Sequence, residues 1–464
     1  MKKLLGFLLL CALLAFAACG GNDNGDDAEV ATPPPQEDVT PDDTATQPAD
    51  DPEPDEDEFV WIYDRREPRD MGGITMYVNA WWLPFDWDAD QWREPSEPGT
   101  KSLYELWREA EERWNVNIEF TVAGWGENVE LLTTSVLAGQ PYADMVRLEN
   151  WQAIPNLAAQ GFLTAFEDIP HAITLDDIDP GVRLFGSFAG RHYGYIPYMG
   201  VGDGLFFNTD IIEREGLPCP FELFEQGQWN WESMIDMMRR ASRVGPDGSV
   251  ETYGMASWFS GLFLPMMLTN GGNMVDEINQ QFVGDSPNTI EALEVMQQMM
   301  SENLLATYEA ADVFLDGNAL FIPMGPWFAS RIREDMGTNF GFIPFPTGPR
   351  GSGHHSIGWG PNMYFIPRGA NPEMLTIFHE VNREFRAQTI HDPDEWVLNY
   401  VNVERAIPAV LLMRQFFRTD RMNGFGIQNL MDWEGLEAGV HQPAPFIEGI
   451  RDQAQALIDN VFLP

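Results

Sequence analysis

The chain has little cysteine and few positive charges. Its 464 residues include three Cys, 27 Lys plus Arg and 72 Asp plus Glu, which gives a net charge of −45. Cys11 and Cys19 lie near the N-terminus, so Cys219 stands alone in the rest of the chain. We therefore expect no intramolecular disulfide and no Cys-based metal site. Nucleic acid is excluded as a partner, because the acidic chain would repel its phosphates.

The apolar run at the N-terminus predicts export. Two lysines precede Leu4 to Phe16, a run too short to be a permanent membrane span. It ends in Phe16-Ala17-Ala18-Cys19, which resembles a bacterial lipobox and implies that Cys19 becomes the lipid-modified first residue of the mature protein. We predict a signal peptide at 1–18. The alternative is an ordinary cleaved signal with an incidental cysteine.

Residues 19–58 lack positive charge. They contain 15 Asp or Glu, no Lys or Arg, and scattered Pro, Thr and Gly. Such a segment is too polar to form a core, and self-repulsion would keep it extended. We predict an acidic, disordered linker that holds a folded body away from the membrane. The body, residues 59–464, has 57 acidic against 25 basic residues, which disfavours an anionic ligand.

Strand patterns alternate with helix patterns at the start of the body. Short apolar, β-branched runs predict strands at 73–78, 116–122 and 143–146. Apolar residues at helical spacing predict helices at 103–114 and 129–137. This alternation favours an α/β fold with a parallel sheet. Because ligands of such sheets bind beyond the carboxyl ends of the strands, the loops after 78, 122 and 146 are candidate site loops.

A series of motifs follows in order along residues 72–464. The series runs Ala138-Gly139-Gln140-Pro141, Gly190-Arg191-His192-Tyr193-Gly194, Leu205-Phe206-Phe207-Asn208, Trp229-Asn230-Trp231-Glu232, Phe314-Leu315-Asp316-Gly317 and Gly325-Pro326-Trp327. In this order the motifs resemble the extracellular solute-binding proteins of the carbohydrate type, which deliver ligand to an ABC importer. Tyr142-Ala143-Asp144 departs from the Pro-Asp of that family.

The resemblance implies an α/β, two-lobed periplasmic-binding-protein-like fold of type II. Each lobe is expected to hold a mainly parallel sheet flanked by helices, with hinge crossings between the lobes. The N-terminal lobe would comprise 59–199 plus about 361–405, and the C-terminal lobe 200–360 plus about 406–464. The crossings would fall near 195–207 and 356–365. Glycines in these crossings would supply hinge freedom or merely form turns: Gly200, Gly202, Gly204, Gly358 and Gly360.

A sugar site pairs flat aromatic rings, which cover the apolar face of the sugar, with polar groups that bind its hydroxyls. The loops described above, and others assigned to the other lobe, contain both kinds of residue. The candidate ligand contacts are Trp81, Trp82, Trp125, Glu127, Glu149, Asn150, Trp151, Tyr198, Asp203, Trp258, Trp327 and Trp359. The resemblance implies that Trp327, in the Gly-Pro-Trp motif, stacks on ligand. Core packing is the alternative for each ring, and for Trp107 and Trp114 it is the expectation.

One acidic segment partly matches a calcium-binding loop. Asp86, Asp88, Asp90 and Glu97 have the spacing of oxygen ligands, but Gln91 occupies the position where the sharp turn needs Gly. We favour a solvated acidic loop, with calcium as the alternative, and expect no cofactor.

The function implied by the resemblance is that of a lipid-anchored solute-binding protein on the extracytoplasmic face of the cell membrane. It would be a monomer that captures a neutral sugar or oligosaccharide by hinge closure and passes it to ABC permease subunits. It would not be an enzyme. Two alternatives remain at this stage. A secreted glycoside hydrolase also needs a Trp-lined site, with two carboxylates, and a carbohydrate-binding surface adhesin would share the aromatic residues.

Overall fold

The computed structural model describes residues 68–81, 93–95, 99–169, 178–197, 199–358, 360–389, 401 and 403–462. All of them belong to one structural unit, Trp61–Pro464, and they build two main β-sheets. The predicted signal peptide, Cys19, the acidic linker and the candidate calcium residues Asp86, Asp88, Asp90 and Glu97 lie outside the described residues. In the described part of the chain, no helix combines the length and apolar character needed to cross a membrane.

The first sheet has the strand order β2-β1-β3-β16-β6. Its strands are β1 (Ile74–Ala80), β2 (Val116–Val122), β3 (Met145–Glu149), β16 (Asn362–Phe365) and β6 (Gly194–Tyr195). β1 runs parallel to β2 and β3, as predicted, whereas β16 runs antiparallel to β3 and β6. β3 begins later than predicted, because Asp144 belongs to the preceding connection, where its carboxylate accepts the backbone N–H of Tyr77.

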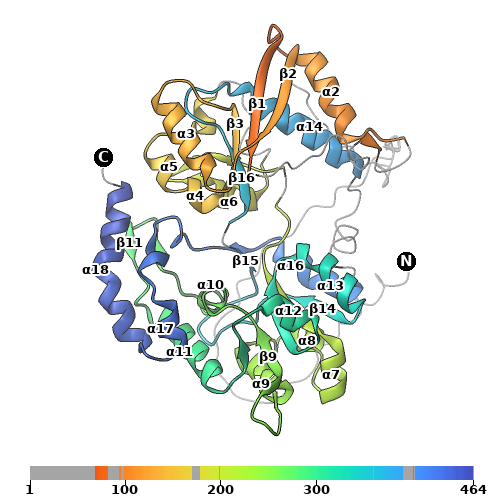
Figure 1. Ribbon diagram of the computed structural model, residues 1–464, viewed down its shortest axis with the longest axis vertical. Helices are drawn as coiled ribbons and strands as arrows, with labels where there is room; N and C mark the ends of the chain where they lie inside the picture. The colour runs from red at the N-terminus through yellow and green to blue at the C-terminus, as the bar shows by residue number, and fades with distance from the viewer. Residues whose placement is uncertain are drawn as a thin grey trace, which may run out of the picture. The chain divides into compact units, whose positions relative to one another are not determined.

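Helices α2 (Leu103–Trp114) and α14 (Glu373–Thr389) lie side by side on the first sheet (Figure 1). α2 begins at the N-cap Ser102, which forms a capping box with Glu105, and it ends at Asn115 in the left-handed conformation. Trp107 and Trp114 are buried, which confirms their predicted place in the core. The other helices near this sheet are α3 (Glu127–Leu137), α4 (Asn150–Ala153), α5 (Asn156–Ala159) and α6 (Pro180–Gly186).

The second sheet has the strand order β12-β9-β13-β7-β14. Its strands are β12 (Leu305–Ala306), β9 (Val250–Ala256), β13 (Ala319–Met324), β7 (Gly204–Asn208) and β14 (Phe340–Ile343), and β8 (Arg243–Val244) pairs with β9. β9 runs parallel to β12 and β13, whereas β7 runs antiparallel to β13 and β14. Both sheets are therefore mixed, because each joins parallel strands to antiparallel strands next to the crossings.

Helices and a hairpin surround the second sheet. They are α7 (Thr209–Glu215), α8 (Pro220–Glu225), α9 (Trp231–Ala241), α10 (Phe259–Thr269), the hairpin of β10 (Val275–Asp276) and β11 (Gln281–Phe282), α11 (Pro287–Ser301), α12 (Ala310–Leu315) and α13 (Ala329–Met336). After α14 come α16 (Ile407–Met413), α17 (Trp433–Glu437) and α18 (Pro443–Phe462). α18 contacts α11 and β11 of the second half of the chain, and it also contacts α5 near the first sheet.

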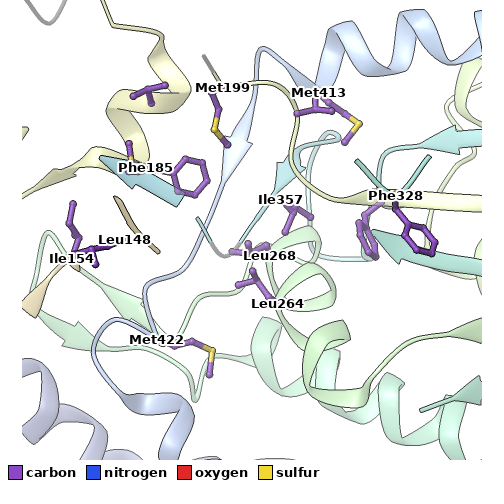
Figure 2. Packing of buried hydrophobic residues seen from close by; sticks show 14 of the residues in the cluster. Leu148, Ile154, Phe185, Met199, Leu264, Leu268, Phe328, Ile357, Met413 and Met422 are labelled. Carbon is purple, nitrogen blue, oxygen red and sulfur yellow. The ribbon is translucent and has the colours of Figure 1, made fainter. Parts of the chain in front are cut away.

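The chain passes between the sheets from β6 to β7 and again from β14 to β16. The second passage contains β15 (Ser356–Ile357), which pairs with β17 (Phe417–Arg418). Ile357 belongs to the same buried cluster as Leu264 and Leu268 of α10, and Figure 2 shows the three side chains together. Both passages fall where crossings were expected. The lobe boundaries at 199/200, 360/361 and 405/406 stay predictions.

Two glycines of the crossings are required by local geometry. A Cβ on Gly202 would overlap the carbonyl oxygen of Ile357 in the other crossing. Gly360 has a φ of 101°, in the region that favours glycine, and a Cβ there would lie 2.8 Å from Cβ of Asn150. These two positions therefore need glycine for close packing and for backbone conformation, whatever freedom they also give a hinge.

Candidate functional site

Tryptophans gather where the parallel strands of the first sheet end. Trp81 follows β1, Trp125 lies just after β2, and Trp151 lies just after β3. The Trp125 side chain is 59% exposed. The ring centroids of Trp125 and Trp151 are 6.4 Å apart and their planes are inclined by 54°. The structure thus brings together two of the aromatic residues that the sequence placed on separate candidate loops.

Glu149 joins these two rings. The indole Nε1 of Trp125 donates a hydrogen bond to Oε1 of Glu149 at 3.2 Å, and Nε1 of Trp151 donates to Oε2 of the same carboxylate. Hydrogen bonds to an ionised acceptor are stronger than neutral ones, so both ring edges are firmly oriented. We call Glu149, Trp125 and Trp151 the indole clamp.

Asn362 adds a polar group beside the clamp. It begins β16 and lies opposite Glu149 in the strand register. Its Oδ1 accepts a hydrogen bond from Nε1 of Trp81 at 3.4 Å. Asn362 was not among the residues predicted from the sequence, because it is 281 positions from Trp81 and only the antiparallel return of β16 brings the two together. The one sequence signal was its position in the second predicted crossing.

Glu127 and Asn150 have structural bonds in this region. Oε2 of Glu127 accepts the backbone N–H of Gly124 at 2.8 Å, so Glu127 holds the turn that carries Trp125. Asn150 is buried, and its Nδ2 donates to the carbonyl oxygen of Phe185 at 2.6 Å. This burial argues against the predicted ligand contact of Asn150 and assigns it to the packing beneath the clamp. Glu127 supports the turn before Trp125, and its ligand contact stays a prediction.

A second group of candidates lies at the end of β9 and β13 in the second sheet. These strands are parallel, so Trp258, after β9, and Trp327, after β13, follow strand ends at one edge. Both rings are exposed, Trp327 by 66%. A Cβ on Gly325 would lie 2.7 Å from Nε1 of Trp327 and 3.1 Å from Oδ1 of Asp203. An exposed indole and a carboxyl group therefore lie beside the same glycine.

The carboxyl group of Asp203 is a free acceptor within the described part of the chain. No donor among the described residues forms a hydrogen bond with its oxygens, although its backbone N–H is bonded to Ile357. Burial raises the pKa of Asp203 to about 6, because desolvation disfavours the charged form. This carboxyl group is therefore able to accept a hydrogen bond from a ligand hydroxyl.

Some of the residues predicted from the sequence lie outside the described residues. They are Trp82, Tyr198, Trp359, Cys19 and the calcium candidates. In the described ranges, no three His, Cys, Asp or Glu side chains are grouped to hold a metal ion. Cys219, which is described, is a free thiol.

Solved structures show the same architecture. The chain is similar to the cyclic alpha-maltosyl-1,6-maltose binding protein of Arthrobacter globiformis, with 14% identity, a TM-score of 0.62, and coverage of 84% of this chain and 100% of that chain. It is similar to the sugar-binding protein MalE of Xanthomonas citri, with 16% identity, a TM-score of 0.61, and coverage of 83% of this chain and 98% of that chain. It is also similar to the GacH receptor of Streptomyces glaucescens, with 14% identity, a TM-score of 0.57, and coverage of 84% of this chain and 99% of that chain. At such identities the likeness establishes the fold.

No curated protein sequence matches the chain. A family model does: residues 94–372 match the one described as bacterial extracellular solute-binding protein, which is more than half of the chain. Such proteins bind solutes and are not enzymes, so the glycoside hydrolase alternative is excluded. The two mixed sheets of this chain and the crossings between them form the periplasmic-binding-protein fold, which the similar structures share. The chain therefore belongs to the bacterial extracellular solute-binding protein family.

Proposed function

We propose that this protein captures a neutral sugar or oligosaccharide and delivers it to the membrane subunits of an ABC importer. The indole clamp carries the proposal. Its rings offer apolar platforms for the C–H face of a sugar, and Glu149 holds them by their N–H edges. Structures of similar fold support the substrate class, because they hold acarbose, mannotriose and maltose as ligands.

The second group supplies the complementary contacts. Trp327 and Trp258 present exposed rings, and Asp203 presents an acceptor for a ligand hydroxyl. Trp81, Trp82, Tyr198 and Trp359 remain proposed contacts from the sequence. A neutral ligand is favoured because Glu149 and Asp203 are acidic and the chain has a net charge of −45.

Closure of two lobes on the ligand is the proposed mechanism. The paired crossings, joined at Asp203 and Ile357, would act as the hinge. Ligand that touches both the clamp and the Trp327 group would stabilise the closed form by its differential affinity. The importer would then recognise that closed form.

Isothermal titration calorimetry of the mature chain tests the proposal. The panel contains maltotriose, cellotriose and mannotriose, with trigalacturonic acid as the anionic control. We expect binding of at least one neutral trisaccharide, no binding of the control, and no release of reducing ends on long incubation. Failure of the folded protein to bind any of the neutral sugars, or turnover of a bound one, would contradict the proposal.

We also propose that Cys19 carries the lipid anchor and that residues 19–58 form the tether. The sequence pattern supports both. In bacteria grown with labelled palmitate, the wild-type chain should be labelled and sediment with membranes. Cys19→Ser should lose the label and appear in the soluble fraction. Equal labelling of the two chains would refute the assignment of Cys19.

A further inference from the structure

A buried guanidinium group contacts the residue that follows Glu149 in the chain. Arg421, between β17 and α17, is only 7% exposed. It donates hydrogen bonds to the carbonyl oxygens of Leu184 at 3.0 Å and Ser187 at 2.8 Å, and to Oε1 of Glu277 at 2.7 Å. A buried charge is tolerated when it is paired and fully bonded, and Arg421 satisfies both conditions.

Asn150 is fixed by this guanidinium and by two other segments. Nη1 of Arg421 lies 3.4 Å from Oδ1 of Asn150. Nδ2 of Asn150 donates to the carbonyl oxygen of Phe185, and its backbone N–H donates to that of Pro361 at 3.2 Å. The backbone of Gly360 lies so close that a Cβ there would be 2.8 Å from Cβ of Asn150. Asn150 therefore has one well-defined position.

The position of Asn150 determines the direction of Glu149. Asn150 is the first residue of α4 and Glu149 is its N-cap. The backbone N–H of Glu149 donates to Oε1 of Gln152 at 3.1 Å, which completes a capping box. A displacement of Asn150 would rotate the start of α4, and with it the carboxylate that holds Trp125 and Trp151.

Asp420 and Arg421 also contact the β10-β11 hairpin in the second half of the chain. The carboxylate of Asp420 accepts the backbone N–H groups of Met274 at 2.7 Å and Val275 at 3.1 Å. Glu277, in the same β10-β11 hairpin, is the ion-pair partner of Arg421. This hairpin lies between α10 and α11, whereas α6 leads to strand β6 of the first sheet. Asp420 and Arg421 together therefore connect the hairpin to the end of α6.

We propose that Arg421 is a positioning residue that holds the indole clamp through Asn150. The inference rests on the proposed function only in taking the clamp as a ligand platform. Because Arg421 is also paired with Glu277, the orientation of the clamp depends on the hairpin of the second half. A movement that separates this hairpin from α6 has to break either the ion pair or the bonds from Arg421 to Asn150 and to the carbonyl groups at the end of α6.

Fluorine NMR of the ligand-free full chain, labelled with fluorotryptophan, tests the positioning role. Trp→Phe variants assign the resonances of Trp125, Trp151 and two control indoles, Trp229 and Trp231, which are buried near the second sheet. Arg421→Lys keeps the charge but lacks the planar set of donors. We expect the resonances of Trp125 and Trp151 to shift, and those of the controls to stay.

Glu277→Gln provides the answer if Arg421→Lys does not fold, because it removes the ion pair while keeping the side-chain shape. It should shift the same two clamp resonances by less. Glu302→Gln is the matched control: it disrupts a pair of similar length, with Arg239 at 2.6 Å, and should shift neither. If Arg421→Lys folds and its Trp125 and Trp151 resonances do not move, the proposal is overturned. If Arg421→Lys does not fold, unmoved Trp125 and Trp151 resonances in Glu277→Gln overturn it. Since no ligand is present, failure of the proposed sugar binding would not alter this result.

Discussion

The backbone N–H of Asp203 donates a hydrogen bond to the carbonyl oxygen of Ile357 over 2.6 Å. The neighbouring Gly202 N–H is bonded to Oγ of Ser356, so the two crossing segments pair with each other as they pass between the sheets. The side chain of the same Asp203 lies beside Gly325, next to the Trp327 ring. One residue therefore links the backbone of the crossings to a proposed ligand contact.

Gly202→Ala tests the close approach of the crossings. The new Cβ would overlap the carbonyl oxygen of Ile357, and we expect the free energy of unfolding to fall by about 1 to 3 kcal/mol. Urea denaturation measures the change. Gly358→Ala is the control in the other crossing, since its nearest atoms would be 3.8 Å away. Equal stability of the two variants would show that the crossings are not tightly paired.

The Asp203 carboxyl predicts how stability varies with pH. Its pKa rises from 3.8 to about 6 on folding, so between these values the folded protein binds more protons than the unfolded chain. Its contribution is therefore fully favourable below pH 3.8 and is lost as the pH rises through 6. Asp203→Asn cannot ionise. Its free energy of unfolding should exceed that of the wild type by about 1 to 2 kcal/mol near pH 7.5. This is less than the full pKa shift of Asp203 would imply, because the residue is partly exposed and solvent screens its charge.

Near pH 4 the same variant should have almost the stability of the wild type, because the wild-type carboxyl is then protonated in the folded state. Urea denaturation across this range provides the comparison. A stability difference that does not change with pH would contradict the raised pKa of Asp203.

Trp327→Ala should weaken sugar binding by about 1 to 3 kcal/mol, the contribution of an aromatic hot spot. The fold should survive, because the Trp327 side chain is 66% exposed. Calorimetry with the neutral sugar that binds the wild type gives the dissociation constant. Ile278→Ala is a control at a side chain that is 92% exposed. An unchanged dissociation constant would remove Trp327 from the site.

Glu149→Gln places an amide NH2 against one of the two indole N–H donors. The clamp loses one hydrogen bond and its charge, so we expect about tenfold weaker binding of the same sugar. Glu448→Gln, on the exposed face of α18, controls for loss of one negative charge. If both variants bind like the wild type, the clamp does not shape the ligand site.

Local elements were predictable because their signals lie within a few residues. The apolar spacing of 103–114 gave the helix that ends at Trp114, and Ser102 with Glu105 marks its start. The run 116–122 coincides with β2. The positions of Trp125 and Trp151 after strands followed from the parallel α/β pattern, since the strand ends of such a sheet share an edge.

The partners of those residues were not predictable from local signals. Glu149 was a candidate ligand contact, yet its carboxylate binds two indoles of the protein itself. Asn150 was a candidate ligand contact in the sequence like Glu149, but the structure shows that Asn150 is buried. Arg421 carried no signal at all, because its role depends on carbonyl groups some 235 positions earlier in the chain.

The sequence by itself determined the α/β class, the order of the family motifs and the set of candidate residues for a proposed sugar site. These properties depend on periodicity and on the chemistry of single side chains. Only the tertiary structure decided that Glu149 clamps two rings, that Asp203 lies beside Trp327, and that Arg421 supports Asn150. Such contacts join distant segments, and their geometry is set by how the crossing strands return to each sheet.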